Sequence, residues 1–301
     1  MRALIALALL AVLAIPASAK TPPPPTEALI VPTGRAPCGI AARDGDLWVG
    51  EYETGRLIRL DATSGRQIGA VRIGRYACRV AIDATTIWVT RDRAGQLVRI
   101  SRKTGRVRTV LIGGEVFDVV LDRDSVWTTS WDTGRIVRLD SRTAKATRIY
   151  VDGLKPASIA RCGGSIWVGH GRGATWLTRI DPRSHRVQRV DVALDEPDWP
   201  RCVRGELWVK AGDSVLQIDP RRGTLLGQYR IGGTPSETAA GPDGLVWVTD
   251  KERSRIHRID AVNRRVVDWF ASGPGAFAMA RAGQAMWVTS FAGADIRKYV
   301  P

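Results

Sequence analysis

Histidine, long apolar runs and helical periodicity are all scarce in this sequence. Only 3 of its 301 residues are histidine, and it contains no HExxH, P-loop or nucleophile-elbow pattern. The usual signatures of metalloproteases, nucleotide-binding proteins and α/β-hydrolases are therefore missing. Beyond the N-terminal region, no stretch keeps a helical apolar period. No segment there is apolar over the roughly 20 residues that a membrane-spanning helix needs. We expect an all-β protein that is not an integral membrane protein.

The N-terminus has the pattern of a secretory signal peptide over residues 1–19. Arg2 gives the positive start, Ala3 to Ile15 form the apolar core, and a small-residue cleavage site ends at Ala19. A Pro-rich spacer, residues 20–25, follows and is predicted to be extended and solvated. The protein is therefore expected to be exported, to the periplasm or the extracellular space.

Tryptophan recurs at a nearly constant interval. Seven of these residues follow one another at steps of 39 to 41 residues: Trp48, Trp88, Trp127, Trp167, Trp208, Trp247 and Trp287. A period near 40 residues with one aromatic in each repeat is typical of a β-propeller. Each repeat reads as four short strands, so the sequence predicts a seven-bladed propeller of four-stranded blades, a single domain over residues 26–301. The recurring Trp side chains are interpreted as packing between blades.

The two ends of the array predict how the ring closes. After Trp287 the chain has one more strand, so the last repeat lacks its fourth strand. The segment from Thr26 to Gly34 resembles the fourth strands of the other repeats. We predict that this N-terminal strand completes the last blade and removes the exposed sheet edges. A free leader strand is the alternative.

The four cysteines form two pairs, each with a separation of 40 residues, or one repeat. Members of a pair therefore occupy similar places on neighbouring blades. This phase predicts the disulfides Cys38–Cys78 and Cys162–Cys202, because both partners lie near the ring axis. A four-cysteine metal site is the alternative, but the spacing is not that of a zinc motif.

The formal charge is +15, and many of the basic residues fall in turns between the third and fourth strands. Those turns share one face of the ring. They favour either attachment to an anionic cell-envelope surface or a solubilising face. Export and the lack of a recognition helix or a stacking-aromatic motif argue against nucleic acid as a partner.

Polar residues that do not repeat mark one mouth of the central channel as the candidate site. They lie where the chain enters the first strand of a blade and where it leaves the second strand. Loops around a rigid scaffold commonly carry binding residues. The proposed ligand-binding residues are Glu51, Arg79, Arg91, Asp118, Trp131, Ser158, His170, Trp199, Glu237 and Asp250. A hydrated channel without a ligand is the alternative.

Two further expectations concern chemistry at this mouth. Glu51, Glu237 and Asp250 are the candidates for a divalent cation site, with Mg²⁺ or Ca²⁺ as the ion, because such ions prefer oxygen ligands. No cofactor is firmly implied. His170 is followed by Gly-Arg-Gly and is expected in an exposed loop.

The repeats resemble a known family. Segments such as GPDGLVWVTDKERSRIHRID and DGDLWVGEYETGRLIRLD are similar to the blades of virginiamycin B (streptogramin) lyase-like propellers, and more broadly to exported YVTN-type propellers. The resemblance implies a Mg²⁺-dependent ring-opening elimination by His at the entering positions and Glu after the Trp segment. Glu51 matches that Glu, and Asp250 is a near match. The entering positions hold no His, since Cys38, Gly39, Glu237 and Phe277 stand there.

These observations lead to one main hypothesis and two alternatives. We expect an exported, monomeric binding or scaffolding module, with a small molecule or a cell-envelope or protein partner at one channel mouth. The first alternative is a metal-dependent lyase or lactonase, whose catalytic residues the sequence does not identify. The second is attachment to an anionic surface through the Arg-rich face.

Overall fold

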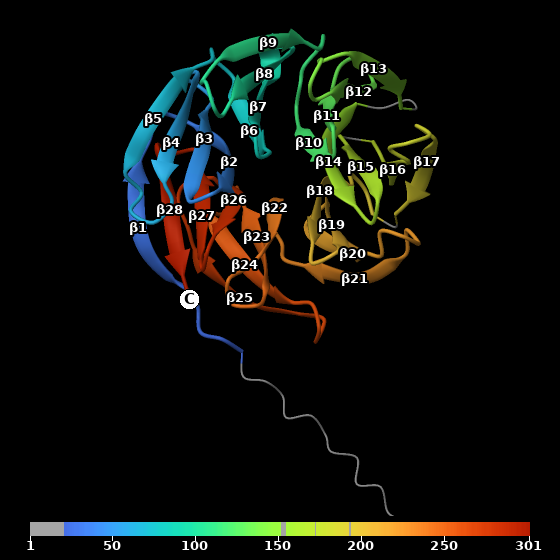
Figure 1. The fold of residues 1–301 in the computed structure, drawn as a ribbon. Helices are drawn as coiled ribbons and strands as arrows, with labels where there is room; N and C mark the ends of the chain where they lie inside the picture. The colour runs from blue at the N-terminus through green and yellow to red at the C-terminus, as the bar shows by residue number, and fades with distance from the viewer. Residues whose placement is uncertain (1–20, 152–154, 172, 193) are drawn as a thin grey trace, which may run out of the picture.

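The computed structural model describes residues 21–151, 155–171, 173–192 and 194–301, and the predicted signal peptide lies outside them. The described chain forms seven four-stranded antiparallel sheets, arranged as blades around a central axis (Figure 1). The predicted all-β, seven-bladed propeller is confirmed. No helix in the described ranges is long and apolar enough to cross a membrane.

Each blade begins at the axis and ends at the rim. Blades 1 and 2 comprise β2 (Pro37–Arg43), β3 (Asp46–Glu51), β4 (Arg56–Asp61), β5 (Gln67–Arg72), β6 (Ala77–Ile82), β7 (Thr86–Arg91), the 3₁₀ turn η1 (Asp92–Ala94), β8 (Gln96–Ser101) and β9 (Val107–Leu111). Blades 3 and 4 comprise β10 (Val119–Asp122), β11 (Ser125–Ser130), β12 (Arg135–Asp140), β13 (Ala146–Tyr150), β14 (Pro156–Cys162), β15 (Ser165–His170), β16 (Trp176–Ile180) and β17 (Val187–Asp191). Blades 5 and 6 comprise β18 (Asp198–Val203), β19 (Glu206–Ala211), β20 (Ser214–Ile218), β21 (Leu225–Arg230), β22 (Pro235–Ala240), β23 (Val246–Asp250), β24 (Arg255–Asp260) and β25 (Arg265–Ala271). Blade 7 comprises β26 (Ala276–Ala282), β27 (Ala285–Ser290), β28 (Asp295–Val300) and β1 (Thr26–Pro32).

The N-terminal strand closes the ring, as predicted. Strand β1 pairs antiparallel with β28, from Thr26 opposite Val300 to Pro32 opposite Asp295. Blade 7 is thus assembled from both ends of the propeller sequence, and its outer strand comes from the start of the domain (Figure 1).

The Pro-rich spacer is anchored on blade 6, while Thr21, Pro23 and Pro24 remain exposed. The buried Arg258 donates from Nη1 to the Pro23 carbonyl at 2.7 Å, and Arg265 donates to the Thr21 hydroxyl at 2.8 Å. Arg258 also pairs with Asp243 at 3.0 Å. Two arginines of the propeller therefore fix this segment.

The repeated tryptophans pack between blades, as expected. Trp48 of blade 1 lies in an apolar cluster with Ile87, Val89 and Val98 of blade 2, and the other six are almost completely buried. Truncation of such a side chain to alanine typically costs about 3–5 kcal/mol. The seams between blades are therefore the hydrophobic core.

Most of these tryptophans face a basic residue on the neighbouring third strand, which accounts for part of the positive charge. Arg59, Arg99, Arg179 and Lys298 lie over the rings of their paired tryptophans, 5.5–5.7 Å from the ring centres. In blades 2, 4 and 7 the same cation donates to a backbone carbonyl in the outer turn of the next blade. Such cation–π contacts contribute about 0.5–2 kcal/mol each.

Two kinds of cross-link join neighbouring blades near the axis. In blades 3, 6 and 7 a Thr on the second strand, two residues after the Trp, donates its hydroxyl to the first strand of the next blade, as Thr129 does to the Ala157 carbonyl at 2.7 Å. At two seams Gly50 and Gly169 take that place instead. A side chain at Gly50 would lie 2.6 Å from the Cys78 carbonyl oxygen, so glycine permits a closer approach of the blades.

Those two close seams are the ones that carry the disulfides. Cys38 and Cys78 bridge blades 1 and 2, with Cα atoms 4.8 Å apart, and Cys162 and Cys202 bridge blades 4 and 5, at 5.2 Å. The predicted pairing is confirmed.

The turns between third and fourth strands share a short-range design. Asp61 accepts hydrogen bonds from the backbone N–H groups of Thr63 and Ser64, at 3.1 and 2.7 Å. The Ala62 N–H donates to the Gly45 carbonyl of the first turn of the same blade at 2.8 Å. Both turns therefore lie on one face, which we call the turn face, opposite the channel mouth.

Candidate functional site

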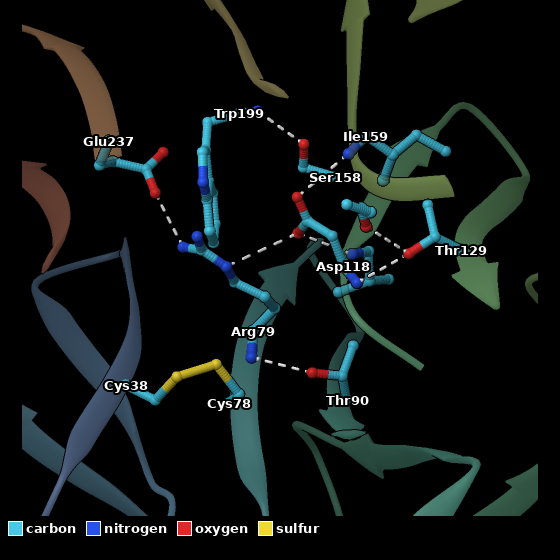
Figure 2. Close-up of polar contacts among 12 residues, drawn as sticks. Cys38, Cys78, Arg79, Thr90, Asp118, Thr129, Ser158, Ile159, Trp199 and Glu237 are labelled. Carbon is cyan, nitrogen blue, oxygen red and sulfur yellow. Dashed lines mark hydrogen bonds and ion pairs between the residues drawn. A yellow bond between two sulfur atoms is a disulfide. The ribbon is translucent and has the colours of Figure 1, made fainter. Parts of the chain in front are cut away.

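A bulge in the first strand aims the entering residues into the channel. The pairing register shifts between Ala77 and Val80 in blade 2, and between Pro235 and Thr238 in blade 6. Such a bulge re-aims side chains at a sheet end. Arg79 and Glu237 lie within these shifted segments and project toward each other across the axis (Figure 2).

Four alternating charges close the channel. Arg79 donates from Nη1 to Glu237 at 2.8 Å. Arg201 bonds both oxygens of Glu237, and its Nη1 lies 3.2 Å from Asp118. These residues come from blades 2, 6, 5 and 3, so the network, which we call the charge quartet, links four blades.

Burial makes the charge quartet strongly interdependent. Burial alone opposes ionisation of Glu237, but the guanidinium groups of Arg201 and Arg79 outweigh it and hold its pKa below the usual value. The carboxylates of Glu237 and Asp118 likewise raise the pKa of Arg201 despite burial. Asp118 also accepts hydrogen bonds from the N–H groups of Val119 and Ile159, at 2.8 and 3.2 Å. These contacts fix the positions of all four side chains.

Arg79 retains unused donors. Its Nε and Nη2 atoms are buried and have no hydrogen-bond partner among the described residues, and Nε lies 3.9 Å from Asp118, beyond hydrogen-bond distance. The guanidinium lies beside the mutually perpendicular rings of Trp199 and Phe277, 4.5 and 4.8 Å from the ring centres. Figure 2 shows it next to Trp199. A buried arginine with free N–H groups is suited to bind an anion.

Above Arg79 the mouth widens into a cavity of about 820 Å³, which we call the mouth basin. Six aromatic side chains line it: Tyr52, Tyr76, Phe117, Trp199, Phe277 and Phe291. Basic side chains alternate with them: Arg35, Arg75, Arg79, Arg93 and Lys251. Its size lies within the range of about 300–1,000 Å³ found for small-molecule sites.

Two titratable groups in the mouth basin are shifted from their ordinary behaviour. Burial raises the pKa of Asp92 to about 6, although the Tyr52 hydroxyl donates a hydrogen bond to it at 3.1 Å. Burial and the nearby Arg79 lower the pKa of Lys251, whose ammonium lies 4.2 Å from the centre of the Phe291 ring. Shifted groups of this kind gather at functional sites.

Below the charge quartet lies a second, smaller cavity of about 290 Å³. Its walls carry apolar side chains of the first strands, including Ile40, Val80 and Met279. Arg79 borders this cavity and the mouth basin, so the charge quartet separates the two spaces.

Several predicted site residues brace loops instead of facing the channel. Glu51 is fully buried and accepts hydrogen bonds from the Gly34 N–H at 2.7 Å and from two nitrogens of Arg56 at 2.8 and 2.9 Å. Asp250, also fully buried, accepts from the Thr234 N–H at 3.1 Å. Arg91 donates to the Arg75 carbonyl and to Gln96. These residues fix the shape of the loops around the mouth basin.

The structure does not gather the three carboxylates suggested for a divalent cation. Glu51 and Asp250 bind loops of blades 1 and 6, whereas Glu237 binds two arginines in the channel. In the described ranges, no group of three or more His, Cys, Asp or Glu side chains is placed to hold a metal ion.

A further cavity of about 420 Å³ holds two other predicted residues, Trp131 and His170. His170 is completely buried at the end of β15, so the expectation of an exposed loop is wrong. Burial lowers its pKa to about 4, and its Nε2 lies 2.8 Å from the Thr178 hydroxyl. Ser158 hydrogen-bonds the buried Asp198 and accepts from the Trp199 N–H, so it supports that strand.

Sequence reasoning missed Arg201, although a signal was present. Directly opposite the Trp, five first strands carry alanine, as with Ala41 opposite Trp48, and blade 3 carries valine, whereas blade 5 carries Arg201 opposite Trp208. A large cation at a position reserved for small side chains marks a functional or structural exception. Asp92 and Lys251 were also missed, because they lie one residue beyond the positions that the repeats align.

Fold and geometry together define a seven-bladed propeller with an aromatic, cationic basin at one mouth. The chain is similar to virginiamycin B lyase from Staphylococcus aureus, with a TM-score of 0.81 and 15% identity over 91% of this chain and 98% of that one. It is also similar to a catalytically inactive variant of that enzyme crystallised with quinupristin, with a TM-score of 0.79, 16% identity and coverage of 92% and 98%.

The same architecture is shared more widely. The Cps50 (Swd1) propeller domain of Myceliophteria thermophila superimposes with a TM-score of 0.79 at 12% identity, covering 92% of this chain and 100% of that one. No model of a known protein family matches the chain, and no curated protein does. At these identities the similarity confirms the predicted resemblance at the level of the fold.

Proposed function

We propose that this protein is an exported ligand-binding module and that a small molecule occupies the mouth basin. The observation that carries this proposal is the pairing of an aromatic-lined cavity of about 820 Å³ with unused donors on the buried Arg79. Apolar walls with a few fixed polar groups are the usual composition of a ligand site.

The lining indicates the chemistry of the ligand. Flat rings such as those of Trp199 and Phe291 favour a planar apolar body. Arg79 at the floor and Lys251 at the side favour a carboxylate or another oxyanion on that body. The charge quartet holds Arg79 in place from behind, and a shift of the neighbouring aromatic side chains would bring a ligand to its buried Nε and Nη2 atoms.

Export rests on the two disulfides and on the predicted signal peptide. Disulfides persist in oxidising compartments, outside the reducing cytosol. Both bridges lie beside the channel, and Cys38 and Cys78 line the mouth basin.

Ring-opening turnover is the second candidate, and one observation favours it. Asp92 has a pKa of about 6 and lies beside Tyr52 in the mouth basin. A carboxyl group with such a pKa exchanges protons near neutral pH, as a general base must. Under this candidate, Asp92→Asn abolishes lactone opening and leaves binding intact.

A thermal-melt screen of the oxidised protein tests the proposal. Naphthalene-2-carboxylate, its neutral amide, several lactones and a streptogramin are each added with and without Mg²⁺. A ligand at 100 times its Kd stabilises the folded state by about 2.7 kcal/mol, which raises Tm measurably. Phe291→Ala and Lys251→Met should remove the shift.

Trp269→Ala serves as the control, because Trp269 lies on the outer strand β25 and is not part of the basin lining. The proposal fails if no compound shifts Tm, or if the basin variants respond like Trp269→Ala.

A further inference from the structure

The seam between blades 3 and 4 departs from the pattern of the seams that follow blades 2, 4 and 7. In blade 2, Arg99 covers Trp88 and donates to the Arg142 carbonyl of the next blade at 3.0 Å. In blade 4, Arg179 covers Trp167 and donates to the Arg221 carbonyl at 2.9 Å. Arg138, the equivalent residue of blade 3, makes neither contact in the part of the chain that the structure describes.

His185 replaces the arginine on Trp127. The imidazole of this blade 4 residue meets the Trp127 ring edge-on, with ring centres 5.9 Å apart and planes at 82°. His185 has a φ of 60°, at the turn position where Gly65 and Gly223 have φ values of 72° and 74°. Ala144 and Arg264 share this left-handed conformation at the same turn position, with φ values of 61° and 52°, so the distinguishing feature of blade 4 is the imidazole itself.

Because His185 occupies the Trp127 ring, Arg138 is left facing a cavity on the turn face. Its Nε atom is buried and has no hydrogen-bond partner among the described residues. The cavity measures about 570 Å³, and its basic lining consists of Arg123, Arg138, Arg161, Arg183 and His185. We call it the interblade cleft.

The acidic residues of the interblade cleft are already engaged. Asp122 pairs with Arg161, and Asp124 lies 3.4 Å from Arg142. Asp181 accepts two backbone N–H groups of its own turn, each at 2.8 Å, and these bonds hold its pKa below the usual value.

Arg123, Arg138 and Arg183 are left without an ion-pair partner among the residues that the structure describes. Three guanidinium groups around one cavity form a set of planar donors that matches a tetrahedral oxyanion.

We propose that the interblade cleft binds the phosphate group of a small phosphorylated molecule. Arg138 and Arg183 hold the phosphate oxygens from the two sides of the seam, and the remaining volume accommodates the body of the ligand. The site lies on the face opposite the mouth basin and is independent of the ligand proposed there.

Calorimetry in a phosphate-free buffer tests the proposal, with inorganic phosphate and glycerol 1-phosphate as probes. Arg138→Met should weaken binding at least tenfold. Arg99→Met is the matched control, since it removes the equivalent arginine of blade 2 and the same charge, and it should leave the affinity unchanged. Arg183→Gln changes an exposed turn residue and provides a second variant should Arg138→Met fold poorly.

A third variant tests the cause of the cleft. His185→Gly introduces the turn residue of blades 1, 2 and 5, lets Arg138 cover Trp127, and should lower phosphate affinity at least tenfold without lowering Tm. Co-sedimentation with phosphatidic acid vesicles distinguishes a lipid headgroup from a soluble phosphate as the source.

Binding of either source that Arg138→Met removes supports the proposal. It is overturned by three results: no binding of either source, equal affinities of Arg138→Met and Arg99→Met, or unchanged affinity of His185→Gly.

Discussion

Two rings of polar residues surround the channel mouth, and they have different tasks. The entering ring, represented by Arg79, Asp118 and Glu237, faces the axis and forms ion pairs between distant blades. The leaving ring, represented by Glu51 and Asp250, is equally buried but bonds the loop of its own blade. Both rings vary from repeat to repeat. Variation alone therefore does not distinguish residues that bind a ligand from residues that hold a loop.

The largest expected effect comes from breaking the entering ring. Arg201→Met leaves Glu237 and Asp118 buried with one cation fewer, which should lower the free energy of unfolding by about 3–5 kcal/mol. Urea denaturation measures the change. Arg230→Met removes an exposed pair with Asp213 at 2.7 Å and should leave the free energy of unfolding almost unchanged. Similar losses in the two variants would show that the charge quartet contributes no more to stability than an exposed ion pair does.

Acid should lower the free energy of unfolding through His170, a residue of the leaving ring at the end of β15. Burial holds the pKa of His170 at about 4, below its ordinary value of 6.5, so folding favours the neutral imidazole. The stability from this group is complete above pH 6.5 and is lost as pH falls toward 4, by up to about 3 kcal/mol.

His170→Gln should therefore have a flatter pH profile of the unfolding free energy between pH 6.5 and 4. Asp92, with its raised pKa, acts in the opposite direction, but it is present in both proteins and cancels in the difference. Parallel profiles would show that folding does not lower the pKa of His170.

The smallest of the three effects separates stability from binding. Glu51→Gln weakens the bonds to Arg56 and Gly34 and should cost about 2 kcal/mol, while the mouth basin keeps its affinity. Glu237→Gln should reduce both quantities, because Glu237 positions Arg79. If Glu51→Gln abolished ligand binding at unchanged stability, the leaving ring would belong to the site, as the sequence suggested.

The fold was predictable because its signals repeat. The Trp period, the missing last strand and the cysteine phase are each confirmed by local geometry that recurs from blade to blade. The site was only partly predictable. The sequence identified Arg79, Asp118, Trp199 and Glu237, which the structure brings together.

The rest depended on side-chain direction. A bulge decides whether an entering residue faces the axis, and a partner in the next loop decides whether a leaving residue is captured. Neither the bulge nor the loop partner can be identified from the residue type alone. Arg201 shows the converse, because its position opposite Trp208 is conspicuous once each blade is compared position by position.

Ring closure by β1 determines when the propeller can finish folding. The strand made first, Thr26–Pro32, finds its partner only when Asp295–Val300 has been synthesised and released. Until then the leader strand has nothing to pair with, and the nascent protein is an open arc of blades. The contact that completes the circle spans nearly the whole domain, and long-range pairing of this kind is slow. A chain that lacks Asp295–Val300 would therefore keep the other blades and have no closed ring.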